Sequence, residues 1–160
     1  HPSLAGGDSG DLVAVSCEWG VAHPPGYPLF TLLGGLFLRL LPFGTPAFRV
    51  NLVSVVCGAA AAVFIYLAFV AWQHGALRPL RRLGGALAAA SFSLSPLVWT
   101  YSTHAEVFSL NSALLAALCW LLARFFGPNG SERDAYAGAL VMGLAVSNQH
   151  TSVLFSLPAA

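Results

Sequence analysis

Four long apolar segments constrain the fold of this chain more than any other feature. Only one of them holds a formally charged residue, Arg124 near its end, and the segments are 50–72, 84–103, 107–126 and 136–157. A helix of about 20 apolar residues crosses the roughly 30 Å hydrocarbon core of a bilayer. The sequence therefore predicts an all-α, multi-span transmembrane helix bundle in contact with the lipid bilayer.

The composition excludes two other classes of protein. The 160 residues are 57% hydrophobic and 8% charged, whereas soluble domains average about 25% charged residues. Disordered chains need low hydrophobicity, which this chain does not have. The net charge is +1, so no basic surface for nucleic acid is expected.

The chain divides into a polar N-terminal region and an apolar remainder. We expect residues 1–49 to form a first luminal loop with interfacial helices, and residues 50–160 to form the bundle. The apolar segment 28–41 is too short to span a bilayer and predicts an interfacial or re-entrant helix. The chain begins at His1 without a visible signal peptide, so we expect a fragment of a longer membrane protein.

Charge placement predicts an orientation. Five of the seven arginines lie in or beside two connections that fall on one side if the spans alternate: Arg78, Arg81, Arg82, Arg124 and Arg133. The positive-inside rule places these connections in the cytosol. The acidic N-terminal region then faces the lumen or the exterior.

The N-terminal acids suggest an amphipathic helix at the membrane interface. Asp8 is expected to cap a helix over 9–19, with Asp11 in its first turn and Glu18 on the same face. One interpretation is a catalytic carboxylate that accepts the proton of a Ser or Thr hydroxyl. The alternative is a capped interfacial helix with a solvated acidic face.

His23 begins a stretch that contains three prolines within five residues. Proline fixes φ and removes backbone donors, so this link is rigid and non-helical. It is expected to hold His23 at a defined place relative to the acidic helix. The alternative is a stiff connector whose histidine is incidental.

One arginine lies in the short apolar segment and another follows it. Arg39 is expected to reach lipid head groups or to contact a lipid phosphate. Arg49 precedes the first span, where it either anchors the chain at the interface or pairs with a leaving phosphate.

Polar residues also occur at the luminal ends of later spans. Thr103 and Glu106 fit a capping box, and Glu106 is also a functional candidate because acids within the membrane region are usually functional. Asn148, Gln149 and His150 lie inside the fourth apolar segment. They are expected either to form interhelical hydrogen bonds or to donate to a phosphate or sugar.

Five sequence blocks carry a resemblance to a known family, and together they span almost the whole chain. They are PSLAGGDSGD at 2–11, GVAHPPGYPL at 20–29, FRVNL at 48–52, AEVFSLN at 105–111 and SNQHT at 147–151. The chain thereby resembles the domain of unknown function 2723 family of transmembrane protein 260-like proteins. The His-Pro-Pro-Gly block is also similar to a segment that follows the acidic motif in protein O-mannosyltransferases.

The resemblance implies a glycosyltransferase of the GT-C superfamily, in the endoplasmic reticulum membrane or a bacterial inner membrane. The implied donor is a polyprenyl-phosphate sugar, most simply dolichyl-phosphate-mannose. The implied acceptors are Ser or Thr hydroxyls of luminal immunoglobulin-like (IPT) domains. Asp8 matches the essential acid of the first luminal loop, and Asp11 is the second candidate. The span expected before Asp8 and the later spans are absent, so we expect this fragment alone to be inactive.

The predicted reaction needs no metal and no further cofactor, because no metal-ligand spacing such as Cys-x-x-Cys occurs. Asp8 or Asp11 is the candidate base. The candidates for donor or acceptor binding are His23, Arg49, Glu106, Asn148, Gln149 and His150. The alternative function is a membrane transporter or lipid-binding scaffold without catalysis, in which the polar residues line a pathway.

Overall fold

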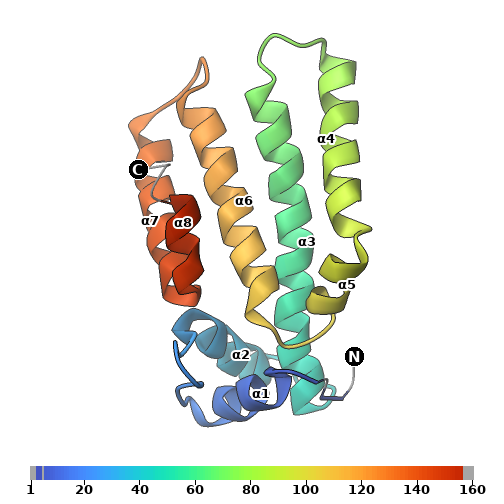
Figure 1. Ribbon diagram of the computed structural model, residues 1–160, viewed down its shortest axis with the longest axis vertical. Helices are drawn as coiled ribbons and strands as arrows, with labels where there is room; N and C mark the ends of the chain where they lie inside the picture. Colours follow the sequence, from blue (N-terminus) through green and yellow to red (C-terminus); the bar gives the residue numbers. More distant parts are fainter. Residues whose placement is uncertain (1–2, 5, 157–160) are drawn as a thin grey trace.

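The computed structural model describes residues 3–4 and 6–156, and these residues form helices joined by loops (Figure 1). The helices are α1 (Ser9–Glu18), α2 (Pro28–Leu40), α3 (Pro46–Trp72), α4 (Arg78–Ser93), α5 (Pro96–Ser102), α6 (Val107–Phe125), α7 (Glu132–Asn148), the 3₁₀ helix η1 (His150–Ser152) and α8 (Val153–Ser156). The all-α prediction is confirmed for the described residues.

Four helices stand side by side in the order α7, α6, α3, α4, and α1 and α2 lie across one end of this row (Figure 1). A buried core ties the two short helices to the row. Leu12 of α1 and Phe30 of α2 are fully buried with Val50 and Val53 of α3. Burial of such side chains is worth about 1.5–3 kcal/mol each. The N-terminal region is therefore part of the packed protein.

Two helices, α3 and α6, are long and apolar enough to cross a membrane. They contain the predicted segments 50–72 and 107–126 with small shifts at their ends. The first begins earlier than predicted because Thr45 caps it, accepting a hydrogen bond from the Phe48 N–H at 3.1 Å, and Pro46 occupies the first turn.

The second predicted segment, 84–103, is divided between α4 and α5, which meet at an angle of 67°. Pro96 follows the break, and it restricts Ser95 to extended backbone with ψ of 126°. The two helices qualify as a third membrane-crossing element only if they are counted as one bent span.

The fourth predicted segment is also interrupted. Helix α7 ends at Asn148 after 17 residues, and Gln149 is extended with φ of −152° and ψ of 123° before the short helices η1 and α8. Residue 157, the predicted end of this segment, lies outside the described residues. The polar side chains at 148–150 coincide with the interruption.

The α1 helix packs within the protein through its buried face, which contains Leu12 and Val13. The apolar face of α1 is therefore used for packing against α2 and α3. The helix ends one residue before the predicted end, because Trp19 lies in the left-handed region with φ of 54°. The position of the helix at a membrane surface stays a prediction.

Charged residues are sorted along the long axis as the sequence predicts. The α3–α4 and α6–α7 loops lie together at one end, away from α1 and α2 (Figure 1). Five arginines lie in or beside these loops, and the acids of α1 lie at the opposite end.

Candidate functional site

The candidate site is built around three side chains of the N-terminal region. Asp8 immediately precedes α1, Asp11 is in its first turn, and His23 lies in the loop between α1 and α2. His23 Nδ1 is 2.8 Å from Asp11 Oδ2, and His23 Nε2 is 3.4 Å from Asp8 Oδ2. One imidazole thus joins both acids, each ring nitrogen facing a different carboxylate.

Local backbone geometry places the histidine there. After α1, the Gly20 N–H bonds to the Val15 carbonyl and turns the chain back along the helix. The His23 backbone N–H then donates to Asp11 Oδ2 at 3.2 Å, so the same oxygen contacts both the backbone and the ring of His23. The structure thus places His23 against the acidic helix, as the proline-rich link predicts.

The contacts alter the acidity of both partners. The hydrogen bond from His23 holds the pKa of the Asp11 carboxyl below its ordinary value. The same hydrogen bond raises the pKa of His23, and the negative charges of Asp8, Asp11 and Glu106 raise it further. The side chains of His23, Asp8 and Asp11 are 41%, 53% and 43% exposed, so a substrate can reach them.

Glu106 approaches the same group from the start of α6. It is only 8% exposed, and its backbone is held by Ser54 of α3. The Ser54 Oγ accepts from the Glu106 N–H and donates to the Glu106 carbonyl, each at 3.2 Å. A Cβ built on Gly7 would lie 3.0 Å from Glu106 Oε1. Burial raises the pKa of the Glu106 carboxyl, and the charge of Asp8 raises it further.

The predicted capping box of Thr103 and Glu106 is wrong. Thr103 ends α5, where its hydroxyl donates to the Thr100 carbonyl at 3.0 Å. Glu106 itself occupies the position before α6, without a side-chain cap. The Glu106 carboxylate instead accepts a hydrogen bond from the Asp8 backbone N–H, which joins it to the N-terminal segment of the site.

A cavity of about 400 Å³ lies between the segment before α1 and the start of α6. Asp8 and Glu106 line it, and so do two residues that the sequence analysis did not nominate, Tyr101 and His104. His104 Nδ1 is 2.6 Å from the Thr100 carbonyl, which orients its ring. The position of His104 two residues before Glu106 was the available signal, because both lie at the same predicted luminal boundary.

The two nominated arginines are occupied elsewhere. Arg49 donates from Nε to the Phe43 carbonyl and from Nη1 to the Leu38 carbonyl, each at 2.9 Å, and so fastens the connection from α2 to α3. Arg39 lies 4.2 Å from the centre of the Trp19 ring in a cation–π contact. Neither lines the acidic cavity.

The polar residues at the end of α7 and just after it lie in different surroundings. Asn148 is 1% exposed, and its side chain donates to the Val107 carbonyl at 3.2 Å. This is the predicted interhelical hydrogen bond, and its acceptor Val107 is the residue that follows Glu106 in the sequence. The side-chain oxygens of Asn148 and Gln149 are buried and have no hydrogen-bond partner among the described residues. His150 is exposed.

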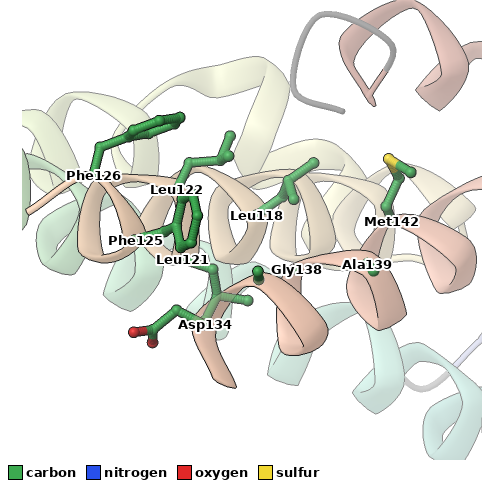
Figure 2. A pocket seen from close by; sticks show the side chains of 10 residues that line it. Leu118, Leu121, Leu122, Phe125, Phe126, Asp134, Gly138, Ala139 and Met142 are labelled. Atoms are coloured by element: carbon green, nitrogen blue, oxygen red, sulfur yellow. The ribbon is translucent and has the colours of Figure 1, made fainter. Parts of the chain in front are cut away.

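An apolar groove lies between α6 and α7 and differs from the acidic cavity. Figure 2 shows Leu118, Phe126 and Met142 along it, with the Asp134 carboxylate turned away from them. That carboxylate binds Arg124 Nε at 2.9 Å. Within the described residues no group of His, Cys, Asp or Glu is arranged to hold a metal ion, and metal independence stays a prediction.

Comparisons with known proteins place this site in a family. The model of the "Protein O-mannosyl-transferase TMEM260 N-terminal domain" matches residues 8–160. A mouse protein named "Protein O-mannosyl-transferase TMEM260" is 48% identical over 160 residues, which is 97% of this chain and 22% of the mouse protein. A Dictyostelium discoideum protein of the same name is 38% identical over 174 residues, 100% of this chain and 20% of that protein.

The chain therefore spans about a fifth of the length of these relatives. No solved structure matches it significantly. Because the family model covers all but the first seven residues, the chain belongs to the TMEM260 N-terminal domain family.

Proposed function

We propose that the protein containing this chain is a membrane O-mannosyltransferase, and that this chain supplies its general base. The observation that carries the proposal is the convergence of Asp8, Asp11, His23 and Glu106 on one end of the bundle. The names of the mouse and Dictyostelium relatives support mannose as the sugar and a protein as the acceptor.

The proposed reaction is an in-line displacement at the anomeric carbon. Asp8 accepts the proton of an acceptor Ser or Thr hydroxyl while the hydroxyl oxygen attacks that carbon. The bond between this carbon and the phosphate oxygen breaks, and the phosphate leaves with the bonding electrons. A single displacement inverts the anomeric centre. Asp8 suits the role because its half-exposed carboxylate lines the cavity.

His23 is proposed to position Asp8 and to offset charge on the leaving phosphate. Asp11 fixes the ring, and the raised pKa keeps His23 protonated at higher pH than usual. His104 and Asn148 are further donors near the cavity. Arg49 is a weaker candidate because two of its donor groups are already bound to backbone carbonyls.

The finer assignments rest on the resemblance of the sequence to GT-C enzymes and are part of the proposal. The donor is a polyprenyl-phosphate sugar, dolichyl-phosphate-mannose in a eukaryote. The acceptors are luminal domains of the IPT type. The site then faces the lumen of the endoplasmic reticulum, with the arginine-rich end in the cytosol.

The test uses the full-length protein in cells that lack the enzyme. Asp8→Asn is compared with Glu18→Gln, which removes a charge from the helix that follows Asp8, outside the cavity. Mannose on an IPT acceptor is measured by mass spectrometry, and transfer from labelled dolichyl-phosphate-mannose is measured in isolated membranes. We expect Asp8→Asn to lower transfer about a hundredfold or more at equal expression, the range for loss of a general base.

Glu18→Gln is expected to retain near-normal transfer. Near-normal transfer by Asp8→Asn would remove Asp8 from the role of base. Failure of the wild-type protein to use dolichyl-phosphate-mannose, while another mannose donor is used, would contradict the proposed donor.

A further inference from the structure

A second polar cavity lies at the end of the bundle opposite the acidic cavity. Its volume is about 440 Å³, and it is lined by His74 from the α3–α4 loop, Arg81 of α4, Arg124 of α6 and the loop segment 127–129. Figure 1 shows the two loops side by side at this end. The cavity thus collects two permanent cations and a histidine from separate elements.

Arg81 has an unmet hydrogen-bonding requirement. Its Nε atom is buried, and no acceptor for it is found within the described part of the chain. A buried donor without a partner is costly, and a charged donor more so. The position of this atom therefore calls for an acceptor that the described residues do not supply.

Arg124 is held in place without losing its capacity to bind an anion. Its Nε bonds to Asp134 Oδ1 at 2.9 Å, and its guanidinium lies 5.2 Å from the centre of the Trp120 ring. Asp134 is 5% exposed, and its other oxygen accepts from the N–H and hydroxyl of Ser131. The ion pair uses Nε alone, so it leaves the two terminal amino groups of Arg124 out of that contact.

The start of α4 strengthens the positive potential. Three arginines, Arg78, Arg81 and Arg82, fall within its first five residues, with no acid in the first turn and no side-chain cap. A helix N-terminus already carries partial positive charge, so cations there are unfavourable unless an anion offsets them. Arg81 is the α4 residue that lines the cavity, and an anion bound there would supply the acceptor that its Nε lacks.

We propose that this cavity binds a phosphate group, carried by an anionic lipid headgroup or by a free phosphate ion. Arginine suits phosphate because its planar fork donates two parallel hydrogen bonds. The cavity lies at the ends of the apolar helices α3 and α6, where lipid phosphates are expected. The site is separate from the acidic cavity, and its failure would leave the proposed mannosyl transfer untouched.

The test compares two neighbouring arginines in the full-length protein. The protein is placed in phosphatidylcholine nanodiscs with and without phosphatidic acid, and bound lipid is measured by native mass spectrometry. Arg81→Gln is compared with Arg82→Gln, which removes the same charge from the same helix turn outside the cavity. We expect Arg81→Gln to weaken phosphatidic acid binding about ten- to a hundredfold, the range of a charged hydrogen bond, and Arg82→Gln to weaken it much less.

The proposal is overturned if the two variants weaken binding equally. It is also overturned if the wild type shows no preference for phosphatidic acid over phosphatidylcholine and binds no inorganic phosphate. Inorganic phosphate is added as a competitor: displacement of the lipid identifies a site for phosphate itself, and retention identifies a lipid headgroup site. If Arg81→Gln folds poorly, as judged by its melting temperature, Arg81→Lys replaces it. A several-fold loss with lysine supports the fork geometry, and wild-type affinity refutes it.

Discussion

Substitution of Gly7 by alanine tests the geometry of the acidic cavity without removing any charged group. Gly7 has φ of +71°, in the left-handed region, and a Cβ there would lie 3.0 Å from Glu106 Oε1. An L-residue in that region costs about 1–2 kcal/mol. The contact is shorter than ordinary van der Waals distance, so the Gly7 backbone and the Glu106 carboxylate must separate by a few tenths of an ångström.

The expected loss of activity follows from that displacement. Misplacement by about 1 Å at a reacting centre can cost about a hundredfold in rate, so a few tenths of an ångström next to Asp8 is expected to cost about tenfold. The strain should lower the melting temperature of the full-length protein by a few degrees at most. Transfer to an IPT acceptor in isolated membranes and a thermal scan measure the two effects.

Gly10 provides a matched control a few residues along the chain. A Cβ at Gly10 meets nothing within 4 Å, and Gly10 lies within the α1 helix outside the cavity. Gly10→Ala should therefore leave transfer unchanged and add about 0.5–1 kcal/mol of stability. If Gly7→Ala retains as much transfer as Gly10→Ala, the close approach of position 7 to Glu106 does not determine the site.

Two further predictions concern the histidine and the helix packing. Asp11→Asn should return the pKa of His23 toward its ordinary value, because the hydrogen bond that His23 donates to Asp11 is the largest cause of the raised value. If protonated His23 is required, transfer falls as pH rises through that pKa, and the fall should begin at lower pH in the variant. Coincident pH–rate profiles would contradict this role. Gly85→Ala places a Cβ 2.9 Å from Tyr66 Cδ2 at the α3–α4 contact and should destabilise the protein by about 1–3 kcal/mol in a denaturation measurement. Gly143→Ala, with nothing within 4 Å, is the control and should not destabilise.

The apolar pattern predicts the long helices well and their interruptions poorly. An uncharged run of about 20 residues forces a helix in a membrane, which is why α3 and α6 are where the sequence places them. The same rule gives no sign of the 67° bend between α4 and α5. A proline in an apolar helix is compatible with a straight span, a kink or a break, and packing against α3 decides among these.

The candidate site could be predicted only in part for a similar reason. Asp11 and His23 are 12 residues apart, and a rigid link of that length brings them close by local geometry. Glu106 reaches the same place through the packing of α6 on α3, a contact between residues 52 positions apart such as Ser54 and Glu106. Sequence spacing assigns Glu106 to the same side of the membrane, and tertiary packing alone gives its hydrogen bond with the Asp8 backbone.

The paired hydrogen bonds between Ser54 and Glu106 have a consequence for how substrates enter. Ser54 is fully buried within α3, a helix of 27 residues, so it anchors Glu106 to a rigid support. The opposing boundary, Gly6 to Asp8, precedes α1 and has no helix of its own. We therefore expect the cavity to widen by movement of the segment from Gly6 to Asp8 while Glu106 stays in place. Acceptors of different size would then contact the same Glu106 carboxylate, and the opposite wall of the cavity would move to accommodate them.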